Sequence, residues 1–256
     1  VQDGIFDTVD EAVAAARKAY KELKQFSRME REKFVQAIRD AAYTNASTMA
    51  EMAVWESGMG RVSDKILKNQ LAATKSPGTE DLKPVAWTGD DGLTLLEMGP
   101  YGVIGSITPT TNPTETIICN GIGMIAAGNA IFFSPHPTAK YTSLWTIRLF
   151  NEAVVKAGGP ANLMTSVANP SIEAANAMMN HPDINMLVAT GGPGVVKAVL
   201  SSGKKSIGAG AGNPPVVVDE TADIPKAAKD IVNGCSFDNN LPCIAEKEVI
   251  AVGSIA

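Results

Sequence analysis

The sequence of 256 residues has few cysteines, few histidines and no long apolar run. Its three cysteines, Cys119, Cys235 and Cys243, have neither zinc-type spacing nor the even number of a disulfide framework, which favours a reducing compartment, the cytoplasm. Two histidines, His136 and His181, argue against a histidine-based metal centre, and we expect no bound metal. The apolar stretches are shorter than the about 20 residues of a membrane-spanning helix, so we expect no membrane span.

Positive charge is also scarce, because 22 lysines and arginines stand against 27 aspartates and glutamates, a formal net charge of −5. No block of like charges interrupts the sequence. Nucleic acids and anionic membranes both select clustered lysine and arginine, so we expect neither as a partner. With 45% hydrophobic and 19% charged residues, the composition is that of a globular protein with a large core.

The N-terminal part of the sequence has helical periodicity. Thr8 and Ser27 each stand three residues before a glutamate, as in a capping box, and an apolar stripe follows each of them. The proline-, glycine- and acid-rich segment 76–91 predicts a loop or a crossing connection. The helices are predicted over 8–23, over 28–55 with a break near 44–45 left open, and from Ser63 onward.

From Leu93 the pattern changes to short β-rich apolar runs that alternate with helical ones. Continuous apolar strands are typical of a parallel sheet covered on both faces, and regular alternation of strand and helix indicates a doubly wound, Rossmann-like α/β sheet. Ligands of such sheets bind beyond the carboxyl ends of the strands, so the residues after each strand are candidates for a site. The strands are predicted at 102–108, 130–134, 163–168, 185–190, 215–219 and 248–252.

Two turns after predicted strands carry candidate binding residues. Gly191 and Gly192 stand before a helix, where backbone N–H groups can approach a phosphate, although an ordinary tight turn explains them equally well. Two prolines stiffen the Thr-Thr-Asn turn that ends at Asn112, and an amide held rigidly there can serve as an oxyanion donor. A stiff turn before a helix, with Thr114 as its N-cap, is the alternative interpretation.

His136 and Cys243 are two further candidates. His136 lies between two prolines, so its imidazole has little freedom, and a surface turn histidine is the alternative. Cys243 follows Pro242 in a polar loop and is a candidate nucleophile. The alternative, a small buried hydrophobic residue, fits Cys119 and Cys235 better.

Together these segments resemble the aldehyde dehydrogenase superfamily and, within it, the CoA-acylating branch of bacterial diol and ethanolamine metabolism. The resemblance covers nearly the whole strand–helix region, and the helical start fits the family's N-terminal part. Five motifs in one order are more specific than any one of them alone. The motifs are TPTTNPTETI (108–117), FSPHPTAK (133–140), LVATGGPGVV (187–196), IGAGAGNPPVVVDETADI (207–224) and SFDNNLPCIAEK (236–247).

The resemblance implies roles for individual residues. Cys243 matches the family's nucleophile, and Asn112 matches the asparagine whose amide, with the cysteine's backbone N–H, holds the oxyanion. The implied cofactor is NAD, with NADP left open, and coenzyme A is a co-substrate. Residues 1–212 are expected to form the N-terminal helices and a dinucleotide-binding domain, and 213–256 the start of a second, catalytic α/β domain. The cofactor-binding residues implied are Thr108, Pro109, Thr110, Ser134, Pro135, His136, Pro137, Thr190, Gly191, Gly192, Val195 and Gly210.

Two departures from the hydrolytic members bear on the reaction. Where those enzymes carry the glutamate that activates water, this sequence has Ala209, which cannot act as a general base. The acyl-enzyme is therefore expected to react with a thiol, CoA, rather than with water. Ser134 and Pro137 stand where many hydrolytic members have a lysine and a glutamate for the adenosine ribose, so the sequence does not distinguish NAD from NADP and leaves room for the adenine end of CoA.

The resemblance implies a reversible oxidation of propionaldehyde or acetaldehyde to acyl-CoA, in the cytoplasm or in the lumen of a bacterial microcompartment. The whole protein is expected to be a homo-oligomer, with microcompartment shell or cargo proteins as further partners. Because the family continues beyond this length, we expect the chain to be truncated after the start of its catalytic domain. Three alternatives stay open: the aldehyde-oxidising half of a bifunctional aldehyde–alcohol dehydrogenase, a semialdehyde or acyl-phosphate reductase, and an inactive nucleotide-binding fragment.

Overall fold

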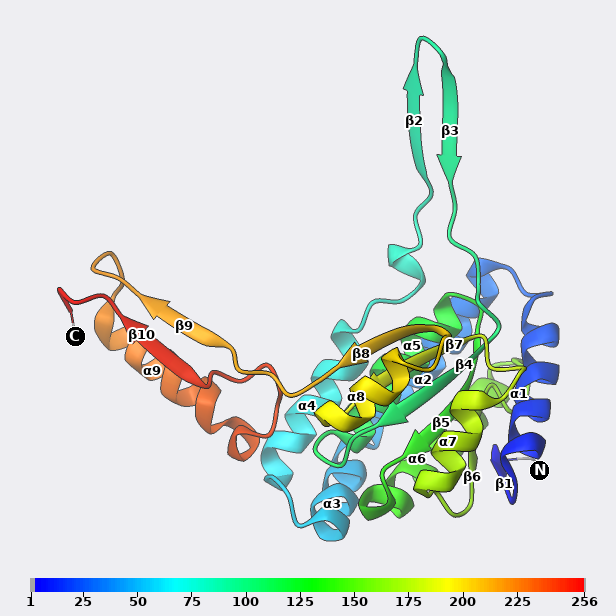
Figure 1. Cartoon of the computed structure of the whole chain (residues 1–256), viewed down its shortest axis with the longest axis horizontal. Helices are drawn as coiled ribbons and strands as arrows, with labels where there is room; N and C mark the ends of the chain where they lie inside the picture. The colour runs from blue at the N-terminus through cyan, green and yellow to red at the C-terminus, as the bar shows by residue number, and fades with distance from the viewer. Residues whose placement is uncertain (1–2, 256) are drawn as a thin grey trace.

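A parallel β-sheet forms the centre of the structure, a computed structural model that describes residues 3–255 (Figure 1). Its strands are β1 (Ile5–Phe6), β4 (Val103–Thr108), β5 (Ala130–Pro135), β6 (Met164–Val167), β7 (Met186–Thr190) and β8 (Lys205–Ala209). Within the described residues they lie in the order β1-β6-β5-β4-β7-β8, all parallel. From β4 the chain moves outward to β5 and β6, then crosses to the other side of β4 for β7 and β8, as in a doubly wound sheet. The predicted Rossmann-like α/β fold is confirmed.

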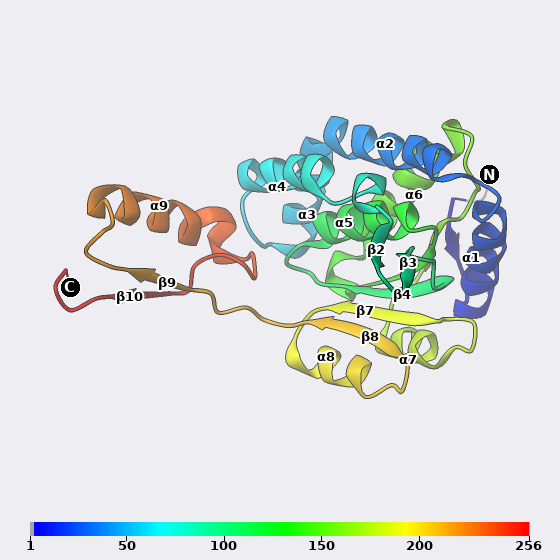
Figure 2. The ribbon, with the colours of Figure 1, turned by 90° about the horizontal axis from the view of Figure 1, so that it is seen from above.

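Helices cover both faces of this sheet (Figure 2). The helices of the chain are α1 (Val9–Leu23), α2 (Arg28–Thr44), α3 (Ala46–Ser57), α4 (Val62–Lys75), α5 (Pro113–Ala126), α6 (Lys140–Lys156), α7 (Ile172–Asn180), α8 (Pro193–Leu200) and α9 (Ile224–Ser236). α5 and α6 pack on one face with α2 over them, whereas α1, α7 and α8 pack on the other. The core between these layers contains fully buried aromatic and aliphatic side chains, among them Phe132 of β5, Ile118 of α5 and Phe150 of α6.

The predicted helix boundaries in the N-terminal part are largely confirmed. Thr8 and Ser27 both form capping boxes, with their side-chain oxygens accepting from the backbone N–H groups of Glu11 and Glu30. The break near 44–45 is present, since α2 ends at Thr44 and α3 begins at Ala46. These caps satisfy N–H groups that a helix start leaves without partners.

The prediction of a loop over 76–91 is wrong, because this segment contains half of a β-hairpin. After a 3₁₀ turn (Thr79–Asp81), β2 (Val85–Gly89) pairs antiparallel with β3 (Gly92–Leu96) around a two-residue turn. The prolines, glycines and acids mark the ends of β2, while its middle has the β-favouring valine, tryptophan and threonine. Every residue of both strands is exposed, and the hairpin projects away from the helices in Figure 1.

The turn after β4 and the strand β8 also differ from the prediction. Asn112 rather than Thr114 is the N-cap of α5, because Pro113 takes the first helical position, where its missing N–H has no cost. Thr114 is instead buried, and its hydroxyl donates to Asn69 Oδ1 at 2.7 Å. The sequence pattern misses β8 because Ile207 is its one large apolar residue.

The segment after β8 forms a small unit at one end of the molecule (Figures 1 and 2). β9 (Pro215–Val218) pairs in parallel with β10 (Glu248–Ala251), and α9 and a 3₁₀ turn (Phe237–Asn240) connect them. No residue of α9 is buried, and β9 and β10 also carry exposed apolar side chains such as Val217 and Ile250. Across residues 3–255, no helix has both the length and the hydropathy needed to cross a membrane.

Candidate active site

The switch point of the doubly wound sheet lies at the carboxyl ends of β4 and β7. The two strands are neighbours, and the connection after β4 leads to one half of the sheet while the connection after β7 leads to the other. Doubly wound sheets bind nucleotides at such a point, because the diverging connections leave a gap there. Thr108 is the last residue of β4, and Thr190 is the last of β7.

The predicted cofactor residues all lie at this edge of the sheet. Thr108, Pro109 and Thr110 end and follow β4; Ser134, Pro135, His136 and Pro137 end and follow β5; Thr190, Gly191, Gly192 and Val195 end and follow β7; and Gly210 follows β8. β5, β4, β7 and β8 are adjacent in the sheet, so the structure brings these residues together. The nucleotide-binding role of each residue stays a prediction.

Two details of this edge fit a dinucleotide. Thr108 Oγ1 is buried and has no hydrogen-bond partner among the described residues, although buried hydroxyls normally have one. At Gly192, φ is −68°, and no described atom lies within 4 Å of the place where a Cβ would stand. The chain itself therefore does not require glycine there, whereas a ligand approaching the backbone would.

His136 is exposed and bonded within its own turn. Its Nδ1 lies 2.8 Å from Thr138 Oγ1 and accepts from the Thr138 backbone N–H at 3.2 Å. Thr110 Oγ1, from the turn after β4, lies 2.9 Å from the same Thr138 hydroxyl. The turns after β4 and β5 are thus tied to each other by side chains.

Cys243 and Asn112 line one groove of about 830 Å³, and Asn112 belongs to the turn that follows β4. Its walls come from α4, the first turns of α5 and the loop of residues 237–246, and they are mostly apolar, with Leu71 and Ile244 among the lining side chains. Cys243 itself is exposed. The structure thereby places the two residues predicted as catalytic, which are 131 positions apart in the printed numbering, in a single apolar groove.

The segment after β8 contacts the backbone of Cys243 directly. A Cβ added at Gly212 would lie 1.9 Å from the Cys243 carbonyl oxygen, far inside contact distance. Only glycine fits this approach. Gly212 therefore sets where the loop of Cys243 lies relative to the end of β8, which carries Ala209.

The residues just before Cys243 have an unusual backbone. Asp238, Asn239 and Asn240 have φ values of 48°, 55° and 61°, in the left-handed region that side chains other than those of Asn and Asp seldom adopt. Asn240 Nδ2 donates to the carbonyl oxygens of Cys235 and Glu246, at 2.6 and 3.1 Å. These bonds hold the turn at both of its ends.

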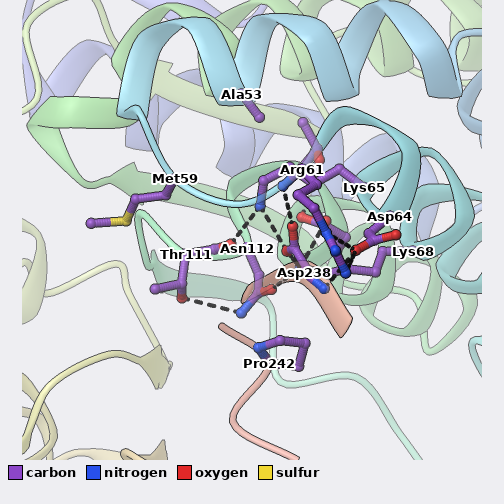
Figure 3. Close-up of polar contacts among 12 residues, drawn as sticks. Ala53, Met59, Arg61, Asp64, Lys65, Lys68, Thr111, Asn112, Asp238 and Pro242 are labelled. Atoms are coloured by element: carbon purple, nitrogen blue, oxygen red, sulfur yellow. Dashed lines mark hydrogen bonds and ion pairs between the residues drawn. The ribbon is translucent and has the colours of Figure 1, made fainter. Parts of the chain in front are cut away.

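Asp238 is fully buried and is the centre of an ion-pair network (Figure 3). Its Oδ2 lies 3.1 Å from Lys65 Nζ and 2.5 Å from Lys68 Nζ, and its Oδ1 accepts from the Arg61 backbone N–H at 2.8 Å. Its own N–H donates to Asp64 Oδ2 at 2.8 Å. A buried carboxylate needs such partners, and here all of them lie at the start of α4.

Asn112 extends this network into the groove. Its Oδ1 accepts from Lys68 Nζ at 2.5 Å, and its Nδ2 donates to Thr111 Oγ1 at 3.1 Å. Figure 3 shows Pro242, the residue before Cys243, beside this amide. An amide with a free N–H, next to a cysteine loop, is the arrangement that stabilises an oxyanion formed on a thiol adduct.

A second cysteine, Cys119, lines the same groove. The interpretation of Cys119 and Cys235 as small buried residues is wrong, because Cys119 is exposed and Cys235 is only partly buried. The thiol of Cys119 is nevertheless partly shielded from water by its neighbours. Burial raises the pKa of the Cys119 thiol, a hydrogen bond from Ser76 Oγ at 3.1 Å opposes this, and the negative charge of Glu115 raises the pKa further. Because the net pKa shift is upward, Cys119 stays a thiol at neutral pH. It is therefore a poor nucleophile compared with a thiolate.

Comparisons with known proteins show which family the chain belongs to. The aldehyde dehydrogenase family model matches residues 1–256, the whole chain. The chain belongs to the aldehyde dehydrogenase family. A CoA-propanoylating propanal dehydrogenase of Salmonella typhimurium is 53% identical over 253 residues, which are 99% of this chain and 54% of that protein. An acetylating acetaldehyde dehydrogenase of the same organism is also 53% identical, over 254 residues.

Solved structures of the family superpose on nearly the whole chain. A propionaldehyde dehydrogenase of Rhodopseudomonas palustris, with bound CoA and an acylated cysteine, is 60% identical with a TM-score of 0.96, and the match covers 100% of this chain and 59% of that one. A propionaldehyde dehydrogenase from a fucose utilisation microcompartment of Clostridium phytofermentans is also 60% identical, with a TM-score of 0.94 and coverage of 98% and 58%. The chain thus spans between 54% and 59% of the length of these relatives.

Sequence reasoning misses the charged part of this aldehyde dehydrogenase groove. Lys65, Lys68 and Asp238 are absent from the predicted site, although each is at least nine-tenths buried. Lys65 and Lys68 stand three residues apart, on the face of α4 that also carries the buried Asn69 and Ala72, and a lysine pair within a buried stripe is a signal of buried ion pairs. Nothing in the sequence indicates that Asp238 is the carboxylate that pairs with these lysines.

Acid is expected to weaken the contact that holds Asp238. Burial raises the pKa of Asp64, but hydrogen bonds from the Asp238 N–H and from Arg61, with the positive charge of Arg61, bring that pKa below its usual 3.8. A carboxyl whose folded pKa is depressed stabilises the fold above its unfolded pKa, and the contribution is lost as the pH falls through the folded value. Urea unfolding of wild type and Asp64→Asn should therefore differ at about pH 7 and converge towards about pH 3. A difference that stays constant with pH would contradict this assignment.

Proposed function

We propose that this chain is part of a CoA-acylating aldehyde dehydrogenase, which oxidises propionaldehyde or acetaldehyde with NAD(P)⁺ and coenzyme A to the acyl-CoA, reversibly. The observation that carries the proposal is the placement of Cys243 and Asn112 in one apolar groove beside the switch point of the sheet. Relatives that are 53% identical and carry CoA-propanoylating and acetylating names support it.

In the first step the Cys243 thiolate attacks the aldehyde carbon, and the carbonyl electron pair moves onto oxygen. The N–H of Asn112 Nδ2 that Thr111 does not bind donates to this oxyanion, while the apolar walls exclude water and so strengthen the interaction. Bound NAD(P)⁺ supplies the hydride acceptor. Loss of hydride from the adduct carbon leaves an acyl thioester on Cys243.

In the second step the thioester is transferred to CoA. The CoA thiolate attacks the acyl carbon, the bond to Cys243 Sγ breaks, and the Cys243 thiolate leaves. Ala209, exposed at the end of β8, has no group that could take a proton from water. A thiolate needs no such base, so the site favours CoA over water.

The residues at the carboxyl edge of the sheet would hold the cofactor. Thr108 offers a hydroxyl, and the open backbone at Gly192 would let the phosphates approach the N–H groups at the start of α8. Ser134 and Pro137 carry no acid that would repel a 2′-phosphate, so NADP is accepted as well as NAD. The same cleft would take the adenine end of CoA after the reduced cofactor leaves, which makes the kinetics ping-pong.

The whole protein, assayed with C2–C4 aldehydes, tests the proposal. Without CoA we expect a burst of about one NAD(P)H per active site and then a stop, because the thioester has no acceptor; with CoA, turnover should continue. Inorganic phosphate should not replace CoA, which separates the proposal from an acyl-phosphate reductase. Steady CoA-independent formation of the acid would contradict the assignment of the acyl acceptor.

The remaining expectations belong to the same proposal. We propose that residues 1–212 form the cofactor-binding part and 213–256 the start of the catalytic domain, and that the whole protein is a homo-oligomer in the cytoplasm or a microcompartment lumen, with shell or cargo proteins as partners. The relative from a fucose utilisation microcompartment supports the last location. Activity with an alcohol and NAD⁺ would favour a bifunctional aldehyde–alcohol dehydrogenase instead.

A further inference from the structure

We propose that Lys68 is a positioning residue, which fixes the end of the Asn112 amide that faces the groove. Lys68 Nζ donates to Asn112 Oδ1 at 2.5 Å (Figure 3). An ammonium has donors only, so the end of the amide that meets Lys68 must be its oxygen. The nitrogen end is therefore turned away from Lys68 and is available to an oxyanion. The inference rests on the role proposed above for Asn112.

The orientation matters because the two ends of an asparagine amide are nearly equal in size. Without a selective neighbour, either end can face the groove. If Oδ1 of Asn112 faced the oxyanion, the partial negative charge of Oδ1 would repel it, whereas an Nδ2 N–H stabilises the negative charge. Thr111 Oγ1 accepts one hydrogen of Nδ2 at 3.1 Å, which leaves the second hydrogen for the substrate.

Lys68 is itself held by two carboxylates. Its side chain is 9% exposed, and its Nζ lies 2.5 Å from Asp238 Oδ2 and 3.4 Å from Glu115 Oε1. The ammonium therefore donates hydrogen bonds to Asn112 and Asp238 and forms an ion pair with Glu115. Asp238 belongs to the loop of Cys243, and Glu115 to the first turn of the helix that Asn112 caps. The ammonium is thus fixed relative to both the donor and the nucleophile loop.

Lys65 holds the backbone next to the same amide. It lies one turn before Lys68 on α4, so the two ammonium groups emerge from one helix face. Lys65 Nζ donates to the Thr111 carbonyl oxygen at 3.0 Å and to Asp238 Oδ2 at 3.1 Å. Lys65 therefore fixes where the turn of Asn112 lies, and Lys68 fixes how its amide is rotated.

A double-mutant cycle on the whole protein tests the proposal. Lys68→Met keeps the apolar stem and removes the donor, so the rate of the NAD(P)H burst without CoA should fall by about 10- to 100-fold, with little change in the KM for NAD(P)⁺. Lys68→Met combined with Asn112→Ala should be no more than about threefold slower than Asn112→Ala alone, because both remove one interaction. A wild-type burst rate in Lys68→Met, or effects that multiply in the double variant, would overturn the proposal.

Lys204→Met is the matched control. Lys204 Nζ donates to the carbonyl oxygens of His181 and Ile184, at the opposite edge of the sheet from the groove. The Lys204→Met substitution also deletes a partly buried ammonium with two partners. The thermal stability of this variant should therefore fall, while its burst rate stays within about twofold of wild type. A loss of burst rate in Lys204→Met equal to that in Lys68→Met would show that the effect is one of general stability and would overturn the proposal.

Lys68→Arg is the second variant, and it tests the proposal if Lys68→Met does not show a native thermal transition. A guanidinium also has donors only, so the amide keeps its direction and the burst rate should stay within about tenfold of wild type. If Lys68→Arg shows a native thermal transition but a burst rate as low as that of Asn112→Ala, the proposal is overturned. Failure of the proposed function has a different signature, since Asn112→Ala would then have the wild-type rate.

Discussion

Cys243→Ala will abolish the aldehyde-dependent formation of NAD(P)H by the whole protein, with or without CoA. Every step proposed for the groove passes through the sulfur of Cys243, and alanine has no nucleophile. Cys119 lines the same groove, but we do not expect it to substitute, because burial of its thiol and the negative charge of Glu115 raise its pKa and so disfavour the thiolate. The measurement is NAD(P)H absorbance in steady state and in the first turnover.

Cys235→Ala is the matched control for this result. The Cys235 thiol lies on α9, where it donates to the Val232 carbonyl oxygen, and it does not line the groove. Its removal should leave the rate unchanged. Mass spectrometry after mixing with aldehyde and NAD(P)⁺ should place the acyl group on the peptide that contains Cys243. An acyl group on another residue, or appreciable turnover by Cys243→Ala, would contradict the assignment of Cys243 as the nucleophile.

Asn112→Ala should lower kcat by about 10²- to 10³-fold, as expected for the loss of one oxyanion donor. The loss should appear in kcat and kcat/KM together, because the Asn112 N–H acts on a charge that exists only after the thiolate has attacked. Steady-state kinetics with propionaldehyde, at saturating CoA and NAD(P)⁺, measure both constants.

Asn120→Ala controls for the loss of an asparagine from the same helix. Its Nδ2 donates to Ser106 Oγ at 3.0 Å, within the packing between α5 and β4. We expect Asn120→Ala to lower the melting temperature without lowering kcat. Equal kcat values in Asn112→Ala and wild type would return Asn112 to the alternative interpretation, in which it is only part of a stiff turn before a helix.

Much of the fold can be predicted from the sequence because its signals are local. Runs such as residues 130–133 of β5 are apolar throughout, as is typical of a strand buried on both faces. The capping boxes at Thr8 and Ser27 mark helix starts within four residues. The exposed hairpin β2–β3 and the edge strand β8 lack this signal. Their side chains are mostly exposed, so these strands do not need a continuous apolar run.

The candidate site likewise has one part that the sequence predicts and one part that it does not. Cys243 and Asn112 are predictable because each stands in a motif, and the motifs occur in the order of one family. The Lys65, Lys68 and Asp238 cluster is not, because its contacts join residues 170 to 173 positions apart and depend on how α4 meets the nucleophile loop. No local pattern specifies which carboxylate a buried lysine will meet.

The long sequence separation within that cluster has a consequence for the order of folding. Asp238 has its partners at the start of α4, so these contacts can fix the turn that precedes Cys243 only once α4 is in place. Contacts that close such long loops form late, since chain entropy opposes them until the surrounding structure exists. The oxyanion donor and the nucleophile therefore come together at the end of folding, and an incompletely folded chain carries an accessible thiol with no donor beside it.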